Sequence, residues 1–108
     1  SRGHHIKFKF MNNDAVSIAP HLHKIIFENE KVRALEVIVE PGDKAEMHTH
    51  PDNVITVLSG GSLIMTFSDG TSKQVDLKTG ITFFGPATEH AVENKSDQTV
   101  KVIQLELK

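Results

Sequence analysis

Short segments of β-type residues, each bounded by a turn signal, constrain the fold of this chain more than any other feature of its sequence. Residues 32–39 form a stretch rich in β-branched side chains that stops at Pro41-Gly42. Residues 62–67 and 72–77 flank Asp69-Gly70, a pair that tolerates positive φ and favours a hairpin turn. About ten such segments, with a turn every eight to twelve residues or so, predict an all-β sandwich or barrel of antiparallel strands.

Helix is expected to be almost absent, because only residues 15–18 could form a single turn, before Pro20. The remaining segments with strand character are 6–10, 23–27, 45–50, 54–58, 81–84, 89–93 and 99–107. The chain has 108 residues, and a second domain would have almost no core. We therefore expect one domain over residues 1–108.

Charge and composition exclude several classes of partner. The formal net charge is −2 and the basic residues form no cluster, so neither nucleic acid nor an anionic membrane is an expected partner. No apolar run approaches the roughly 20 residues that span a bilayer. Cysteine is absent, which excludes thiolate ligands and cysteine nucleophiles and favours a cytoplasmic location.

His48-Thr49-His50 is the motif that carries chemistry. Strand side chains alternate with a period of two, so both imidazoles project from the same face of a strand. Two imidazoles side by side can bind a metal ion, and His90, about forty residues later, could supply a third from a distant strand. A facial set of three ligands leaves coordination positions open for a substrate.

The residues around these histidines resemble the two motifs of the cupin superfamily. Gly42-x5-His48-x-His50 is similar to the start of the first motif, and Val57-Leu58-Ser59-Gly60 resembles the strand end that follows it. Gly80-x5-Pro86 followed by His90-x3-Asn94 resembles the second motif. The resemblance covers roughly residues 40 to 95. It implies a small single-domain cupin with a jelly-roll β-barrel and a metal ion in its mouth.

The chain departs from the cupin pattern where the pattern has a ligand glutamate. Counting from His50 puts Val54 or Ile55 at that place, and counting back from Gly60 puts Asn53 there. The prediction is therefore a site of three histidines, His48, His50 and His90. Such a site leaves a divalent ion with its full charge and makes it a strong Lewis acid.

Glu46 is the candidate for the missing carboxylate. It stands two residues before His48, and strand parity would place it on the same face, where it could bind the metal or act as a base. It is the predicted catalytic residue. The other H-x-H pair, His21-Leu22-His23, has no motif around it and lies near a proline turn. We predict that these two histidines lie on the surface or at the rim of the pocket.

Two kinds of function fit this site. One is a small metal-dependent enzyme, either a dioxygenase or a redox-neutral isomerase or lyase, acting on a small oxygen-bearing substrate. The other is a binding or sensor module without turnover. Charged or hydroxyl side chains opposite the histidines would favour catalysis, and an apolar wall would favour binding. Imidazole ligands suit Fe, Mn, Ni, Zn and Cu alike, so the sequence predicts one divalent transition metal without choosing among them.

The extreme N-terminal segment indicates a homodimer. Ile6, Phe8 and Phe10 alternate along one face of a predicted strand. Such a strand would expose an apolar edge, which proteins usually cover or pair. We therefore expect the sheet of a second copy to cover it, as is common among small cupins.

Overall fold

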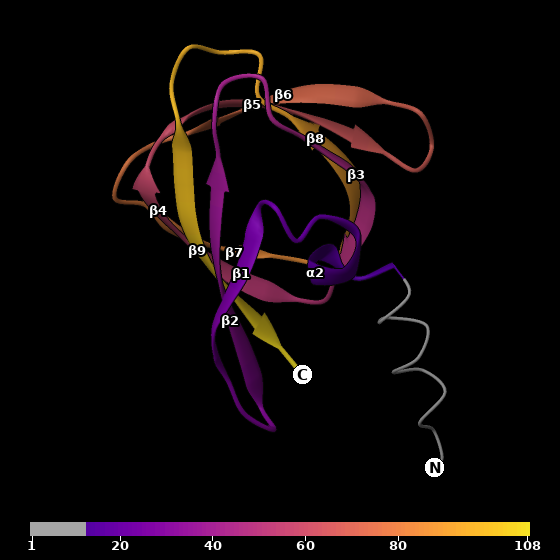
Figure 1. Cartoon of the computed structure of the whole chain (residues 1–108), viewed down its shortest axis with the longest axis vertical. Coiled ribbons are helices and arrows are strands. Elements are labelled where there is room, and N and C mark those ends of the chain that lie inside the picture. The colour runs from indigo at the N-terminus through magenta and orange to yellow at the C-terminus, as the bar shows by residue number, and fades with distance from the viewer. Residues whose placement is uncertain (1–12) are drawn as a thin grey trace.

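The structure, a computed structural model, describes residues 13–108, which form one short helix and nine strands (Figure 1). Their bounds in chain order are α2 (Ala15–Ile18), β1 (His23–Glu28), β2 (Val32–Val39), β3 (Lys44–His50), β4 (Asn53–Ser59), β5 (Gly61–Phe67), β6 (Ser72–Leu77), β7 (Thr82–Gly85), β8 (Thr88–Glu93) and β9 (Val100–Leu107).

The strands form two antiparallel sheets. Five strands pair in the order β1-β2-β9-β4-β7, and four pair in the order β3-β8-β5-β6. Figure 1 shows the two sheets curving around a common interior, with the β1–β2 hairpin extending beyond it. The prediction of an all-β, antiparallel jelly roll is confirmed. Among the described residues the pairing gives two sheets that face each other, without one continuous closed ring.

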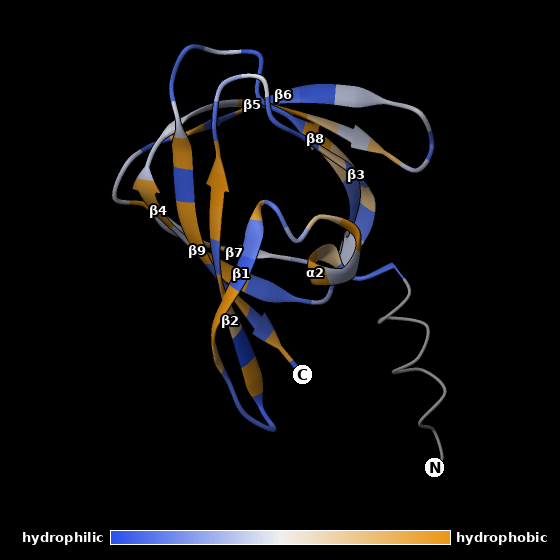
Figure 2. Cartoon of the chain, viewed as in Figure 1, coloured by the Kyte–Doolittle hydropathy of each residue, from blue (hydrophilic) through white to orange (hydrophobic). Residues whose placement is uncertain are grey.

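The core lies between the sheets because the strands alternate. Along β9, residues at positions 100, 102, 104 and 106 are buried and their neighbours are partly exposed. Figure 2 shows apolar and polar residues alternating along this strand, and the two buried positions at its C-terminal end are the polar residues Gln104 and Glu106. The buried apolar side chains from both sheets include Leu35, Val57, Leu63 and Val92, which belong to one cluster.

The predicted strands from residue 23 onward agree with the observed ones to within one residue at each end. The helical turn at residues 15–18 is also present as α2. The predicted strand at 6–10 lies outside the described residues. No helix in the described part of the chain is long and apolar enough to cross a membrane.

The short helix α2 packs against the strands β3 and β1, which carry histidines of the candidate site. Its N-terminus is capped by the Asp14 carboxylate, which accepts a hydrogen bond of 3.1 Å from the Val16 amide. Ala15 and Ala19 are completely buried, so this segment is a fixed part of the fold.

Candidate metal centre

A bulge in β3 sets the direction of its histidines. Ala45 pairs with Val92 and His48 pairs with His90, so the register shifts between them. Ala45, His48 and His50 are the buried residues of the strand, with spacings of three and then two. Two residues of β3 therefore oppose one of β8, which is the arrangement of a β-bulge. The prediction that His48 and His50 share an inward face is confirmed.

The same bulge turns the Glu46 side chain outward, and the parity argument that placed it beside His48 is wrong. Glu46 is exposed, on the opposite side of the strand from the histidines. Its main chain takes part instead, because its carbonyl oxygen lies 2.6 Å from Nδ1 of His48. A catalytic role for the Glu46 carboxylate stays a prediction that this geometry does not support.

His23 lies inside the site, and the expectation that it sits on the surface or at the rim is wrong. It is the first residue of β1 and the only buried one of that strand, with 5% of its surface exposed. Pairing with β2 in the register His23↔Val37 brings it to the interior. His21 is exposed, as expected, and its Nε2 lies 2.8 Å from the carbonyl oxygen of Lys44.

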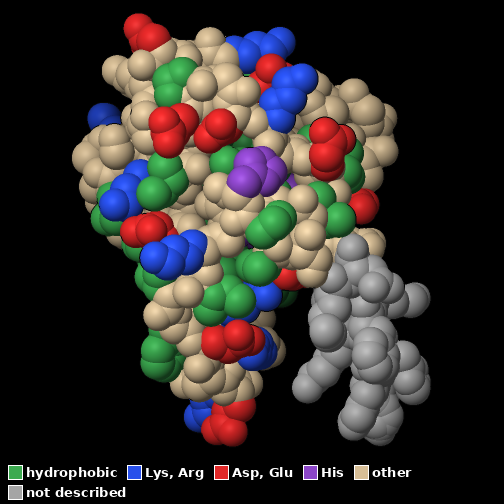
Figure 3. Space-filling model, in the orientation of Figure 1, with side chains coloured by type: hydrophobic (Ala, Val, Ile, Leu, Met, Phe, Trp, Pro, Cys, Tyr) green, Lys and Arg blue, Asp and Glu red, His purple; other side chains and the backbone are tan. Residues whose placement is uncertain are grey.

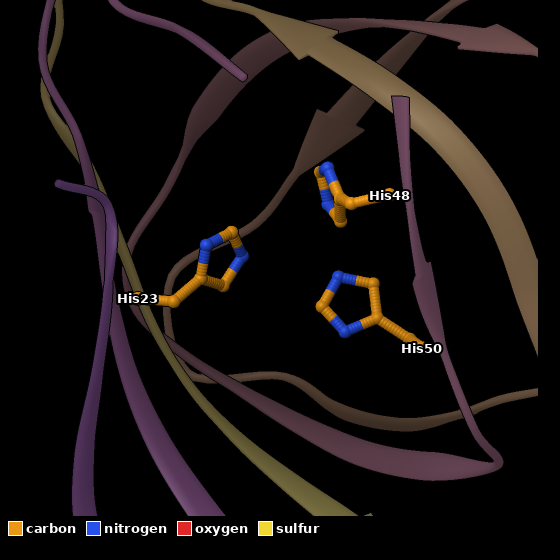
Figure 4. A group of neighbouring side chains, drawn as sticks. All are labelled: His23, His48 and His50. Carbon is orange, nitrogen blue, oxygen red and sulfur yellow. The ribbon is translucent and has the colours of Figure 1, made fainter. Parts of the chain in front are cut away.

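Three imidazoles converge in the interior between the sheets. One ring nitrogen from each of His23, His48 and His50 lies within 4.8 Å of the others. Figure 4 shows His48 and His50 projecting from one strand and His23 facing them from another. The ring centroid of His23 is 5.2 Å from that of His48 and 5.4 Å from that of His50. We call these three residues, together with His90, the histidine cluster.

His90 borders the other three from β8. Its ring centroid is 5.0 Å from that of His48 and 5.3 Å from that of His50, both at steep interplanar angles. Its ring centroid also lies 6.4 Å from that of Phe67. Among the described residues, the group with mutually close nitrogen atoms contains His23 rather than His90. The structure thus places all three predicted metal ligands together and adds a fourth imidazole.

Hydrogen bonds fix which ring nitrogen of His23, His48 and His50 faces the centre. Nδ1 of His23 lies 3.0 Å from the Ala19 carbonyl oxygen, and Nδ1 of His48 contacts the Glu46 carbonyl. Carbonyl oxygens only accept, so each Nδ1 carries the hydrogen and each Nε2 keeps its lone pair. Nδ1 of His50 lies 2.8 Å from the Glu106 carboxylate, with the same consequence. Partners of this kind orient metal-binding imidazoles in proteins.

Burial favours the neutral form of His23, His48 and His90. Burial lowers the pKa of His23 to about 4, although its hydrogen bond to Ala19 opposes the shift. Burial, followed by repulsion from His50 and His48, lowers the pKa of His90 to about 3. The pKa of His48 is also lowered by burial. Neutral imidazoles are the form that binds metal.

One buried ring nitrogen in the histidine cluster has no hydrogen-bond partner among the described residues. Nε2 of His48 is the buried side-chain polar atom, among the described residues, that lacks a hydrogen-bond partner. A buried polar atom without a partner costs about 1–3 kcal/mol, and a metal ion or a water molecule bound at this nitrogen would remove that cost. A divalent transition metal fits this donor set of neutral imidazole nitrogens.

Behind His50 lies a buried network of charges. Glu106, only 2% exposed, accepts from Nδ1 of His50 through Oε2 and from Nε of Arg33 at 2.8 Å through Oε1. Arg33 also forms an ion pair with Asp14, ahead of α2. The sequence signal that places Glu106 inside is its parity with Val100 and Val102 on the last strand, although Ile103 interrupts the apolar alternation there.

Asn53 does not replace the missing glutamate as a ligand. Its Nδ2 donates to the carbonyl oxygens of Pro51 at 2.8 Å and Gly85 at 3.2 Å. Its Oδ1 accepts a hydrogen bond of 3.1 Å from Nε2 of Gln104. Both amide hydrogens of Asn53 and its side-chain oxygen are therefore engaged within the protein, and the bond from Gln104 orients the Gln104 amide.

The histidine cluster lines a cavity of about 140 Å³ between the sheets. Apart from the four histidines, Gln104 is the polar side chain of the lining. The rest of the wall is aliphatic or aromatic, with Leu63, Met65 and Phe83 among its members. The site is therefore a patch of imidazole in an otherwise apolar cavity.

The family relationship follows from this combination of fold and histidines. A family model described as "Cupin domain" matches residues 35–106, which is most of the chain. The chain belongs to the cupin family. The match includes the strands that carry His48, His50 and His90. His23 lies before the matched residues, which explains why the motifs did not point to it.

Solved structures of other cupins are similar to this chain. A cupin domain protein from Bordetella pertussis is 28% identical, with a TM-score of 0.74 over 81% of this chain and 92% of that one. A cupin-2 domain protein from Shewanella frigidimarina is 25% identical, with a TM-score of 0.54 over 80% and 79%.

A polyketide cyclase from Streptomyces resistomycificus shares the fold at 22% identity, with a TM-score of 0.59 over 79% of this chain and 63% of that one. No curated protein matches the sequence.

Proposed function

We propose that this cupin is a small metal-dependent enzyme whose substrate is a compact, largely apolar molecule bearing oxygen. The observation that carries the proposal is the buried, partnerless Nε2 of His48 among imidazoles whose Nδ1 atoms face oxygen acceptors. The four imidazoles of the histidine cluster would hold one divalent ion, and His23, His48 and His50 are the three whose nitrogen atoms lie mutually close. When bound, that ion supplies Lewis acidity and, if it is redox-active, a route for electrons.

The protein's own side chains limit the kind of reaction. A redox-neutral isomerase or lyase needs a general base near the substrate, and the predicted one, Glu46, is exposed. The cavity lining offers no carboxylate or hydroxyl side chain among the described residues. The geometry therefore favours redox chemistry of the dioxygenase kind over proton transfer by a protein group.

The cavity limits the size of the substrate. A volume of about 140 Å³ is close to that of engineered cavities, roughly 150 Å³, that accommodate benzene. A short diketone or a small thiol fits such a space, and a flavonol does not. The apolar wall would exclude water from the reacting atoms and strengthen electrostatic interactions there.

Gln104 would orient the substrate. Asn53 uses both of its amide hydrogens on carbonyl groups, so its Oδ1 must accept from Gln104. This fixes the Gln104 amide, and within residues 13–108 its own oxygen accepts no side-chain hydrogen bond. Gln104 lies two residues before Glu106 on the inward face of β9, and Glu106 is the residue that contacts Nδ1 of His50. Its oxygen could accept a hydrogen bond from a hydroxyl or enol group.

A non-catalytic binding module is the second candidate, and the apolar wall favours it. An imidazole cluster facing aliphatic side chains could retain a small ligand at a metal ion without turning it over. The two candidates differ in whether oxygen is consumed in the presence of a substrate of the right size.

Oxygen uptake tests the proposal. The protein should be purified without a histidine tag or an immobilised-metal column, stripped of metal, and loaded in turn with Fe, Mn, Ni, Zn or Cu. Oxygen consumption would then be followed with short 1,3-diketones and small thiols, with a flavonol as the oversized control. The proposal predicts uptake with at least one redox-active metal and a small substrate. Saturable substrate binding without uptake under every metal would favour the binding module.

A further inference from the structure

The buried carboxylate of Glu106 accepts hydrogen bonds from two sides. Oε1 accepts from Nε of Arg33 at 2.8 Å, and Oε2 lies 2.8 Å from Nδ1 of His50. Arg33 carries only donors, so the oxygen that faces it must be an acceptor. A carboxylate can present an acceptor to both neighbours. A side-chain amide in the same place cannot, because one of its ends is a donor.

This two-sided acceptance determines the tautomer of His50. With a carboxylate in front of it, Nδ1 carries the hydrogen and Nε2 keeps the lone pair that faces the histidine cluster. An amide at position 106 would turn its oxygen to Arg33 and its NH₂ group to His50. Nδ1 would then have to accept, and the hydrogen would move to Nε2, where it blocks metal binding.

The network also carries a negative charge. Two carboxylates, those of Asp14 and Glu106, surround the single guanidinium of Arg33 and leave one negative charge in excess. Burying such a charge is costly unless something compensates it. The side chain of Glu106 is 2% exposed, and the carboxylate oxygen that does not face Arg33 faces the His50 imidazole. A cation at the cluster would lie one imidazole away from this charge.

We infer that Glu106 is a positioning residue that acts through His50. It fixes the metal-binding tautomer of His50. It also supplies, from the far side of the His50 imidazole, the negative charge that the glutamate ligand of the cupin motif would supply directly. The inference deepens the proposed function and rests on its metal-binding part. Arg33 and Asp14 hold the Glu106 carboxylate in place. The ¹⁵N resonances of the metal-free protein report the tautomer, so this part of the inference can be tested without any metal.

The variant Glu106→Gln tests the inference, with Glu36→Gln as the matched control. Glu36 is also a strand glutamate, but it lies 3.6 Å from Lys101 and its side chain is 27% exposed. Ring-nitrogen spectra of the metal-free proteins would give the tautomer of His50, and competition with a chromophoric chelator would give the affinity for Zn²⁺ and Co²⁺. Circular dichroism would establish that each variant is folded.

We expect His50 to carry its hydrogen on Nδ1 in the wild type and on Nε2 in Glu106→Gln. Metal affinity should fall roughly 10- to 100-fold in Glu106→Gln, as for other residues that support a ligand, and stay unchanged in Glu36→Gln. An unchanged tautomer with wild-type affinity in a folded Glu106→Gln protein would overturn the inference.

The wild-type spectrum covers the case in which Glu106→Gln does not fold. A hydrogen on Nε2 of His50 in the metal-free wild type would overturn the inference without any variant. Failure of the wild type to bind metal, with the expected tautomers in both proteins, would overturn the charge-supplying role and the proposed function but leave the tautomer assignment in place.

Discussion

At the scale of single residues, the site depends on how each imidazole is held. The sequence identified His48 and His50 from their spacing, because parity on a strand is a local property. It could not identify His23, whose place depends on the pairing of β1 with β2. Nor could it assign the hydrogen-bond partners, which are the Ala19 carbonyl, four residues before His23, and the carboxylate of Glu106 on the distant strand β9.

The pair His21 and His23 provides a residue-scale test with its own control. Both belong to the same H-x-H motif, but only His23 is buried in the cluster. We expect His23→Ala to weaken metal binding by more than about tenfold, because loss of a ligand should exceed loss of a supporting residue. His21→Ala should leave the affinity unchanged. Chelator competition on both variants measures this, and equal affinities would remove His23 from the ligand set.

At the scale of elements, the strands were predictable and the bulge was not. Alternation and turn residues placed β2 and β6 at their observed bounds. A bulge adds one residue to a strand without a distinctive signature in a run such as Lys44-Ala45-Glu46-Met47-His48. It therefore reversed the direction of Glu46 relative to simple parity. Whether Asn53 replaces the motif glutamate likewise depends on its contacts with Pro51 and Gln104, which the sequence does not show.

Glu46→Gln tests the consequence of the bulge. Because the carboxylate is exposed and only the carbonyl contacts His48, the variant should keep its metal and any turnover within about twofold. Metal content by elemental analysis and the oxygen-uptake rate of the loaded protein would measure both. A folded variant that keeps its metal but loses turnover would restore Glu46 as a base, and loss of metal would make it a ligand.

At the scale of the whole molecule, the buried histidines couple stability to pH. The folded-state pKa of His23 is about 4 and that of His90 about 3, below the ordinary value near 6.5. The unfolded chain therefore binds more protons below about pH 6.5, and stability falls as the pH falls from there toward 4. Each such imidazole contributes up to about 1.4 kcal/mol per pH unit.

Urea unfolding of the metal-free protein at pH 7 and pH 5 would measure this loss. We expect a lower free energy of unfolding at pH 5, and a smaller difference in His90→Phe, which removes one of the titrating groups. Equal stability of the wild type at the two pH values would contradict the assignment of neutral, buried imidazoles.

Two features of the surface, its mixed charges and an apolar row across the five-stranded sheet, are relevant to possible partners. Figure 3 shows acidic and basic side chains interspersed on the face in view. One row of paired residues across the five-stranded sheet is apolar and ends in Phe27 and Phe84, which are 55% and 57% exposed. The cytoplasmic location and the absence of a nucleic-acid partner stay predictions from the sequence.

The homodimer is also still a prediction. Its sequence basis, Ile6, Phe8 and Phe10, lies outside the described residues. The exposed ends of the apolar row, Phe27 and Phe84, add apolar surface that a second copy could cover. We expect a mass of two chains by sedimentation equilibrium at micromolar concentration and a weaker dimer after removal of residues 1–10. A monomer at that concentration would refute the prediction.

Metal titration of the untagged protein measures whether the histidine cluster binds one divalent metal ion, on which the proposed function depends. Replacing His4 and His5 by alanine would remove imidazoles outside the described residues from the measurement. We expect one Zn²⁺ or Co²⁺ per chain for this protein, with affinity lowered more than about tenfold in His48→Ala, His50→Ala and His90→Ala. A folded His48→Ala protein that binds one ion with unchanged affinity would contradict this expectation.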